Sequence, residues 1–143
     1  MRAKTMFATQ PDSVEITAGD SGSAVVFLRE NIEPVQLSDD SIGYQADEYT
    51  MVMPFSTNLA VRISADFPVY LDQAKAKDYA DTASAVRGKR NVLLEKTDKD
   101  CLVDRNPSDA ILAYRQALRD VPEQSGFPYN VVWPELAEFV NAG

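Results

Sequence analysis

The chain has 143 residues and a mass of 15.8 kDa, which allows one compact domain, or one small domain with an appendage, and excludes a large multidomain enzyme. Its 45% hydrophobic and 25% charged residues are typical of a folded globular protein. The net charge of −8 repels phosphate backbones and anionic lipid headgroups, so we expect neither nucleic acid nor a membrane as a partner.

The sequence contains no histidine and one cysteine, Cys101. The absence of histidine removes the commonest general base and the commonest zinc ligand, and it excludes a Ser-His-Asp triad. A single cysteine cannot form an intrachain disulfide, which fits a reducing compartment. We therefore expect no catalytic residue, no cofactor and no metal, and a protein that is not an enzyme.

Short β-type runs fill the first half of the chain, where proline and glycine separate stretches of β-branched and aromatic residues. We interpret the polar segment Gln36–Asp47 as the loop of a longer hairpin. Residues 10–66 are thus predicted to form a small, mostly antiparallel sheet, because short strands pair most easily with their sequence neighbours. The predicted strands are Ser13–Thr17, Ala24–Ile32, Tyr49–Met53 and the run through Leu59, Val61 and Ile63.

The hydrophobic period changes to about 3.6 residues after Pro68, which indicates helices. A second helix is predicted from an N-cap at Asn106 to about Asp120, with Pro107 at its first position. Together the two helices predict an antiparallel hairpin over residues 72–120. The apolar stripe of the first helix is Ala76, Tyr79, Ala83, Val86, Arg90, Leu93 and Thr97.

Prolines and aromatic residues alternate in the last segment, which predicts an extended arm followed by a helical turn at Glu135–Asn141. The whole chain is predicted to be α+β. We expect three parts: a β-rich N-terminal domain (1–70), a helical hairpin (71–121) and an extended C-terminal arm (122–143).

Four motifs of the C-terminal third resemble the bacteriophage and prophage tail (fibre) assembly chaperones. They are Leu93–Asp98 (LLEKTD), Ala113–Gln124 (AYRQALRDVPEQ), Gly126–Pro128 (GFP) and Val132–Pro134 (VWP). The sequence departs from the family at Lys99, where family members commonly have tryptophan. The β-rich part, with Phe27–Glu33 and Asp47–Tyr49, is similar to the opening of such proteins in prophages of Gram-positive bacteria.

The resemblance implies a non-enzymatic tail protein that acts in the bacterial host cytoplasm, or remains in the phage tail, and binds a tail or tail-fibre protein. An alternative is a small carbohydrate- or surface-binding module with a helical oligomerisation hairpin. Its ligand would contact aromatic side chains of the sheet, which are Phe27, Tyr44, Tyr49 and Phe55.

Aromatic and cationic side chains of the C-terminal third are the candidate partner-binding residues, because such residues are enriched at interface centres. Arg115 and Arg119 either pair inside the hairpin, with Asp98 among the available acids, or bind carboxylates of a partner. The arm either packs on its own hairpin or contacts a partner. The candidates are Tyr114, Arg115, Arg119, Phe127, Tyr129 and Trp133.

Small residues along the first helix leave a shallow face that the shorter second helix covers only in part, so we expect the protein to form homo-oligomers. The loop acids Asp98, Asp100 and Asp104 lack the glycine and the bidentate glutamate of a calcium loop. They are interpreted as a solvated loop.

Overall fold

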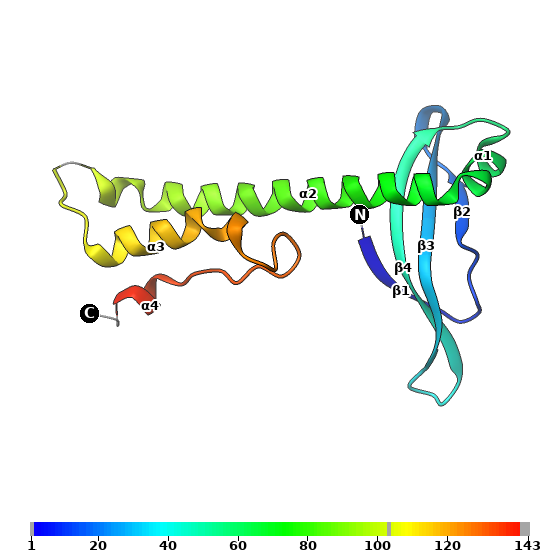
Figure 1. Ribbon diagram of the computed structural model, residues 1–143, viewed down its shortest axis with the longest axis horizontal. Helices are drawn as coiled ribbons and strands as arrows, with labels where there is room; N and C mark the ends of the chain where they lie inside the picture. Colours follow the sequence, from blue (N-terminus) through cyan, green and yellow to red (C-terminus); the bar gives the residue numbers. More distant parts are fainter. Residues whose placement is uncertain (1, 103, 141–143) are drawn as a thin grey trace. The chain divides into compact units, whose positions relative to one another are not determined.

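The computed structural model describes residues 2–102 and 104–140 of the chain. It divides into two compact units, Met1–Asp78 and Tyr79–Gly143, and the long helix α2 (Phe67–Lys96) runs from the first unit into the second. A four-stranded antiparallel sheet lies in the first unit, and helices follow it along the chain (Figure 1). This arrangement confirms the predicted α+β fold class.

The strands are arranged in the spatial order β1-β4-β3-β2, and each neighbouring pair is antiparallel. The strands predicted at 13–17, 24–32 and 49–53 are confirmed, and the last two extend well beyond their predicted ends. The bounds are β1 (Arg2–Phe7), β2 (Val14–Ala18), β3 (Ser23–Gln36) and β4 (Ile42–Pro54).

Two predictions for this part of the sheet are wrong. The polar segment 36–47 is mostly strand, and only residues 37–41 connect β3 to β4. Strand β1 was not predicted at all. Both errors have one cause, because β1 and the start of β4 pair with each other, with Lys4 opposite Asp47 and Phe7 opposite Tyr44. Backbone pairing in a ladder stabilises these segments although their side chains are polar.

One face of the sheet packs under α1 (Leu59–Ala65) and the first part of α2. Val26 and Leu28 on β3 have no exposed surface, and Tyr49 lies opposite Leu28 on β4. Burying a side chain of this size contributes about 1.5–3 kcal/mol. The core consists of Ala24, Val26, Leu28, Tyr49, Leu59, Ile63, Leu71 and Ala74.

Residues 59–63 were predicted as a strand and instead form helix α1, so this prediction is wrong. Leu59 and Ile63 are both buried, whereas Val61 is 72% exposed. Apolar residues at positions i and i+4 share a face in a helix as well as in a strand. In a strand, Val61 would share the buried face of Leu59 and Ile63, so its exposure is typical of a helix.

The opposite face of the sheet carries a buried arginine, Arg29, which is 5% exposed. Its guanidinium donates hydrogen bonds to Glu48 at 2.7 Å and to Glu15 at 2.5 Å. A third bond reaches the carbonyl oxygen of Asp12 at 3.1 Å, in the segment 8–13 that carries the chain from β1 to β2 at the opposite edge. Burial lowers the pKa of Arg29, but the bonds to Glu15 and Glu48 raise the pKa overall, so the side chain remains a cation.

A β-bulge interrupts the pairing of β3 with β4 between Glu30 and Glu33. Asn31 has a φ of 52° there, in the left-handed region that asparagine tolerates better than most residues. Its side-chain amide donates to Asp47 Oδ2 at 2.8 Å. That bond, together with the charges of Arg2 and Lys4, outweighs partial burial and lowers the pKa of Asp47.

In the second unit, α3 (Asp109–Arg119) lies alongside the last part of α2 and runs in the opposite direction (Figure 1). The predicted hairpin is therefore present, with η2 (Asp98–Cys101) in its connection. The N-cap of α3 is Ser108, whose hydroxyl accepts from Ile111 N, and not Asn106 as predicted. The C-cap at Asp120 agrees with the predicted end of this helix.

The predicted stripe of the first helix is confirmed for its later members. Ala83 and Thr97 are buried, and Val86 and Leu93 are half-buried, whereas Ala76 is exposed. The buried residues of α3 and the turn after it pack in the same unit, and they are Tyr114, Leu118 and Val121.

The C-terminal segment is less extended than predicted. It begins with η3 (Val121–Glu123), continues through turns and bends at residues 124–130, and has no regular secondary structure at 131–135. Helix α4 (Leu136–Val140) confirms the predicted helical turn, and Asn141 lies outside the described residues. Contacts with α3 hold α4 in the second unit.

Candidate protein-binding surface

The C-terminal segment, residues 121–135, folds back on its own unit, and we call it the arm. Gln124 fixes its path, because the Gln124 side-chain amide accepts from Val132 N and donates to Val132 O, both at 2.8 Å. These two bonds imitate the pairing of a neighbouring strand. The side chain of Gln124 thereby closes the loop between residues 124 and 132.

A tight turn within this loop requires glycine at position 126. Asn130 N donates to Gly126 O at 2.6 Å. A Cβ atom on Gly126 would lie 2.2 Å from the carbonyl oxygen of Asn130, which is far inside van der Waals contact. The turn brings the aromatic residues on either side of buried Pro128 to the same place on α2.

Tyr79 is the centre of an aromatic cluster. Its ring meets the rings of Phe127 and Tyr129 edge-on, with centroid distances of 6.5 Å and 6.2 Å. Edge-to-face pairs of this kind contribute about 0.5–1.5 kcal/mol beyond the area that they bury. Tyr79 is nevertheless 49% exposed and Tyr129 is 44% exposed. The cluster therefore anchors the arm and still presents aromatic surface to solvent.

Two cations of α2 lie over aromatic rings of the arm. The guanidinium carbon of Arg87 is 5.2 Å from the centroid of Phe127. Lys89 Nζ is 4.3 Å from the ring centroid of Trp133. Both distances lie within the usual range of cation–π contacts. The side chains of Arg87 and Lys89 come from exposed positions of the helix.

We define the arm surface as the residues that make these ring and cation–ring contacts, together with Val132, the most exposed apolar residue of the arm. Val132 is 77% exposed, although it lies between residues that contact α2. A partner could therefore bury Val132 and Tyr129 without displacing the arm. The arm surface comprises Tyr79, Arg87, Lys89, Phe127, Tyr129, Val132 and Trp133.

Three of the six predicted partner-binding residues belong to the arm surface: Phe127, Tyr129 and Trp133. The arm packs on its own hairpin through Phe127 and Trp133, so these two side chains serve the unit's own structure as well. Sequence reasoning missed Arg87, Lys89 and Val132 as surface residues and Gln124 as their support. The alternation of prolines and aromatics marked the arm but not the helix residues that it meets.

The other three predicted residues lie on α3. Tyr114 is 7% exposed and belongs to the core of the unit. Arg115 binds the end of α2, through Leu94 O and Thr97 Oγ1 at 2.7 Å and Asp98 at 2.8 Å. Arg119 is exposed and has no hydrogen-bond or ion-pair partner among the residues that the structure describes.

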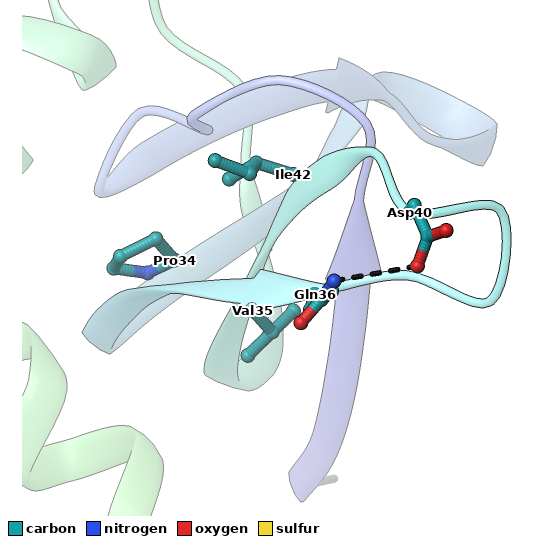
Figure 2. A pocket seen from close by; sticks show the side chains of 5 residues that line it. All are labelled: Pro34, Val35, Gln36, Asp40 and Ile42. Carbon is teal, nitrogen blue, oxygen red and sulfur yellow. Dashed lines mark hydrogen bonds between the residues drawn. The ribbon is translucent and has the colours of Figure 1, made fainter.

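A separate pocket of about 400 Å³ lies at the tip of the β3–β4 hairpin (Figure 2). Its polar groups already bond to each other, because Gln36 Nε2 donates to Asp40 Oδ1 at 3.4 Å. Ile42 is 70% exposed beside it. The pocket is shallow, and its lining of Pro34, Val35, Gln36, Asp40 and Ile42 offers a ligand no free charged cluster.

The aromatic residues proposed for a carbohydrate-binding face do not gather on one face of the sheet. Tyr49 points to the helices and is 6% exposed, whereas Phe27 lies on the opposite face under Arg29. Phe55 follows β4 in a loop. Tyr44 lies on the same face of the sheet as Phe27, so only two of the four aromatic residues share a face.

Within the described residues, no group of three or more His, Cys, Asp or Glu side chains is arranged to hold a metal ion. Likewise, no helix in the described part of the chain is long and apolar enough to cross a membrane. Cys101 is free and half-buried.

The second unit thus combines a helical hairpin with a docked arm that presents aromatic, apolar and cationic side chains. Residues 83–138 match the family model described as phage tail assembly chaperone protein. The match begins in α2 and ends in α4, so it confirms the resemblance for the C-terminal part and supports a role in phage tail assembly. No curated protein and no solved structure matches the chain.

Proposed function

We propose that this protein is a non-enzymatic chaperone of phage tail assembly that binds a tail or tail-fibre polypeptide through the arm surface. The match of residues 83–138 to the phage tail assembly chaperone family carries this proposal. The exposed side chains of Tyr129 and Val132, near the C-terminal end of the matched segment, support the assignment of the contact.

The chaperone would cover apolar surface of the tail polypeptide while that polypeptide folds in the host cytoplasm. Binding to a partly folded state stabilises it by mass action, and closure of the tail oligomer would remove the surface and release the chaperone. Tyr114 and Arg115 would act by holding the hairpin together, and Arg119, Phe127, Tyr129 and Trp133 would face or support the partner. The β-rich part (1–70), the hairpin (71–121) and the C-terminal segment (122–143) would be the three parts of the chain.

Co-expression with a phage tail or tail-fibre polypeptide tests the proposal. Val132→Ala and Tyr129→Ala should reduce the amount of polypeptide that co-purifies, because both remove exposed contact area. Val61→Ala is the matched control, since Val61 is 72% exposed and Val132 is 77% exposed. Equal capture by all variants, or no capture by the wild type, would reject the proposed contact.

Phe127→Ala and Trp133→Ala need thermal melts beside the capture assay, because both rings contact α2. A loss of about 3–5 kcal/mol of stability is expected for an aromatic residue that serves only as core. We expect smaller stability losses together with reduced capture. Full capture by variants that melt well below the wild type would show that the arm serves folding alone.

Two further parts of the proposal need their own measurements. A chaperone that leaves the tail should be absent from purified particles, whereas a minor tail component should be found there by mass spectrometry. Self-association also remains a prediction, supported by the exposed Ala76 on α2. Light scattering at high concentration should give more than 15.8 kDa, and that monomer mass would exclude a homo-oligomer.

A further inference from the structure

Cations that lie over aromatic rings in the first unit also contact a carboxylate. Arg29 lies 4.7 Å from the centroid of Phe7 and bonds to Glu48 at 2.7 Å. Lys75 lies 5.9 Å from the centroid of Tyr49, and its Nζ atom is 2.7 Å from Glu30. In each case one cation contacts both an aromatic ring and a carboxylate.

The corresponding pairs of the second unit lack such a carboxylate among the described residues. Arg87 over Phe127 and Lys89 over Trp133 have no ion-pair partner among the residues that the structure describes. The chain does not lack acids, because it has 22 acidic and 14 basic side chains. The two cations are therefore left without carboxylates at the arm, in a protein with carboxylates in excess.

We propose that the arm surface binds an acidic segment of the partner, whose carboxylates contact Arg87 and Lys89 and whose apolar side chains contact Tyr129 and Val132. This inference rests on the proposed function and specifies the chemistry of the partner. Phe127 and Trp133 hold the two cations at opposite ends of the arm segment 127–133. Along the arm, Tyr129 and Val132 lie between these two cation–ring contacts, so a segment that docks beside either cation can also cover an exposed apolar side chain.

Charge pairing of this kind increases the association rate and the specificity for the partner more than the affinity of the complex. An exposed ion pair contributes a factor of about 1.5 to 5 in binding, and salt screens it. The apolar contacts would supply the rest of the affinity. Binding should therefore weaken with ionic strength and depend on the negative charge of the partner.

Trp133 is the only tryptophan, so its fluorescence reports directly on this surface. We would titrate the protein with three synthetic peptides of about a dozen residues that share one pattern of leucine and serine and carry glutamate, glutamine or lysine at the remaining positions. The glutamate peptide should change the Trp133 emission saturably, and its affinity should fall about fivefold between about 50 mM and about 300 mM NaCl. Equal binding of the glutamine peptide would overturn the proposal.

Charge variants locate the contact. Arg87→Gln and Lys89→Gln should each weaken binding of the glutamate peptide about threefold. Lys99→Gln is the matched control, because Lys99 is exposed in the same unit and the net charge changes equally. Lys89→Arg keeps a cation over Trp133 and should restore binding. An equal loss in Lys99→Gln would indicate a nonspecific charge effect and overturn the proposal.

Thermal melts of these variants separate binding from folding, since both cations also contact the arm. Capture of the co-expressed tail polypeptide separates this inference from the proposed function. Wild-type capture by the Arg87→Gln, Lys89→Gln double variant would overturn the inference and leave the function intact. A concentration-dependent change of Trp133 emission without peptide would assign the surface to a second copy of the chain and would also overturn it.

Discussion

Arg115 on α3 donates a hydrogen bond from Nη1 to the carbonyl oxygen of Leu94, in the last turn of α2, over a distance of 2.7 Å. The last carbonyl groups of a helix have no partner within the helix, and a cation is favoured there by the helix dipole. Arg115 also bonds to Thr97 Oγ1 and pairs with Asp98. One side chain of α3 thus caps α2 and joins the two helices.

Replacing Arg115 by alanine should destabilise the second unit by about 2–3 kcal/mol, because the hydrogen bonds and the ion pair of a charged group are lost, whereas Leu94 O keeps its bonds from Thr97. Arg115→Lys should recover only part of the loss, since an ammonium cannot reproduce the guanidinium geometry. Urea denaturation followed by Trp133 fluorescence measures both. Arg119→Ala is the control and should change stability by less than about 0.5 kcal/mol; a similar loss in both variants would contradict the assignment.

Gln124→Ala should release the arm, because both hydrogen bonds to Val132 disappear. We expect a loss of about 1–2 kcal/mol and faster proteolysis within residues 124–135. Gln124→Glu keeps the acceptor for Val132 N but places a carboxylate against Val132 O, so it should behave like the alanine variant. Unchanged proteolysis in both variants would show that the aromatic contacts alone hold the arm.

Gly126→Ala and Gly88→Ala should change stability in opposite directions. The added Cβ at position 126 would meet Asn130 O at 2.2 Å, whereas at position 88 it meets nothing within 4 Å. Gly88 lies inside α2, where alanine is better than glycine by about 0.5–1 kcal/mol. Thermal melts should show a lower Tm for Gly126→Ala and a higher Tm for Gly88→Ala. A harmless alanine at position 126 would contradict the tight turn.

The first unit should lose stability in acid through Asp47, whose pKa is lowered mainly by the hydrogen bond from Asn31. A lowered folded-state pKa means that the stabilisation is complete above the unfolded-state pKa of about 3.9 and is lost as the pH falls through the folded-state value. Asp47→Asn should destabilise the protein at neutral pH and show a weaker decline below about pH 4. Urea midpoints across this range measure the effect, and Asp66→Asn, at an exposed aspartate, should retain the wild-type decline.

Arg29→Met should cost about 3–5 kcal/mol, because it leaves the partly buried carboxylate of Glu48 without its cation. The bond to Asp12 O is also lost, so the segment between β1 and β2 should exchange its amide hydrogens faster. Arg62→Met is the control, since its guanidinium bonds only to the exposed Ser56 hydroxyl among the described contacts. Equal hydrogen exchange of this segment in the two variants would contradict the prediction that Arg29 holds it against the sheet.

The sequence predicts strands followed by helices because the spacing of its apolar residues changes from about 2 to about 3.6 near Pro68. It fails at residues 59–63, where Leu59 and Ile63 fit both a strand and a helix and only the exposure of Val61 distinguishes them. It fails at β1 because an edge strand paired on one side needs little apolar surface, and Arg2 and Lys4 conceal the alternation.

The arm was predictable as a segment because its prolines exclude a long helix, and its aromatic residues indicated contact. Its docking site was not predictable. In the sequence, Tyr79 looks like any other apolar residue of a helical stripe. Lys89 looks like an ordinary solvent-exposed lysine. Their roles depend on the turn at Gly126, which determines the residues that the arm contacts. Such contacts depend on tertiary structure and do not appear in the sequence pattern.

The pairing order of the sheet also sets an order in time. Strands β1 and β2 are synthesised first, yet β1 pairs with β4 and β2 pairs with β3. A nascent chain that ends before residue 42 therefore has no native neighbour for β1, and the N-terminal segment waits until β4 has left the ribosome. The β2–β3 pair can form before β4 is synthesised, whereas β1 can join the sheet only after β4, although β1 precedes the other three strands in the chain.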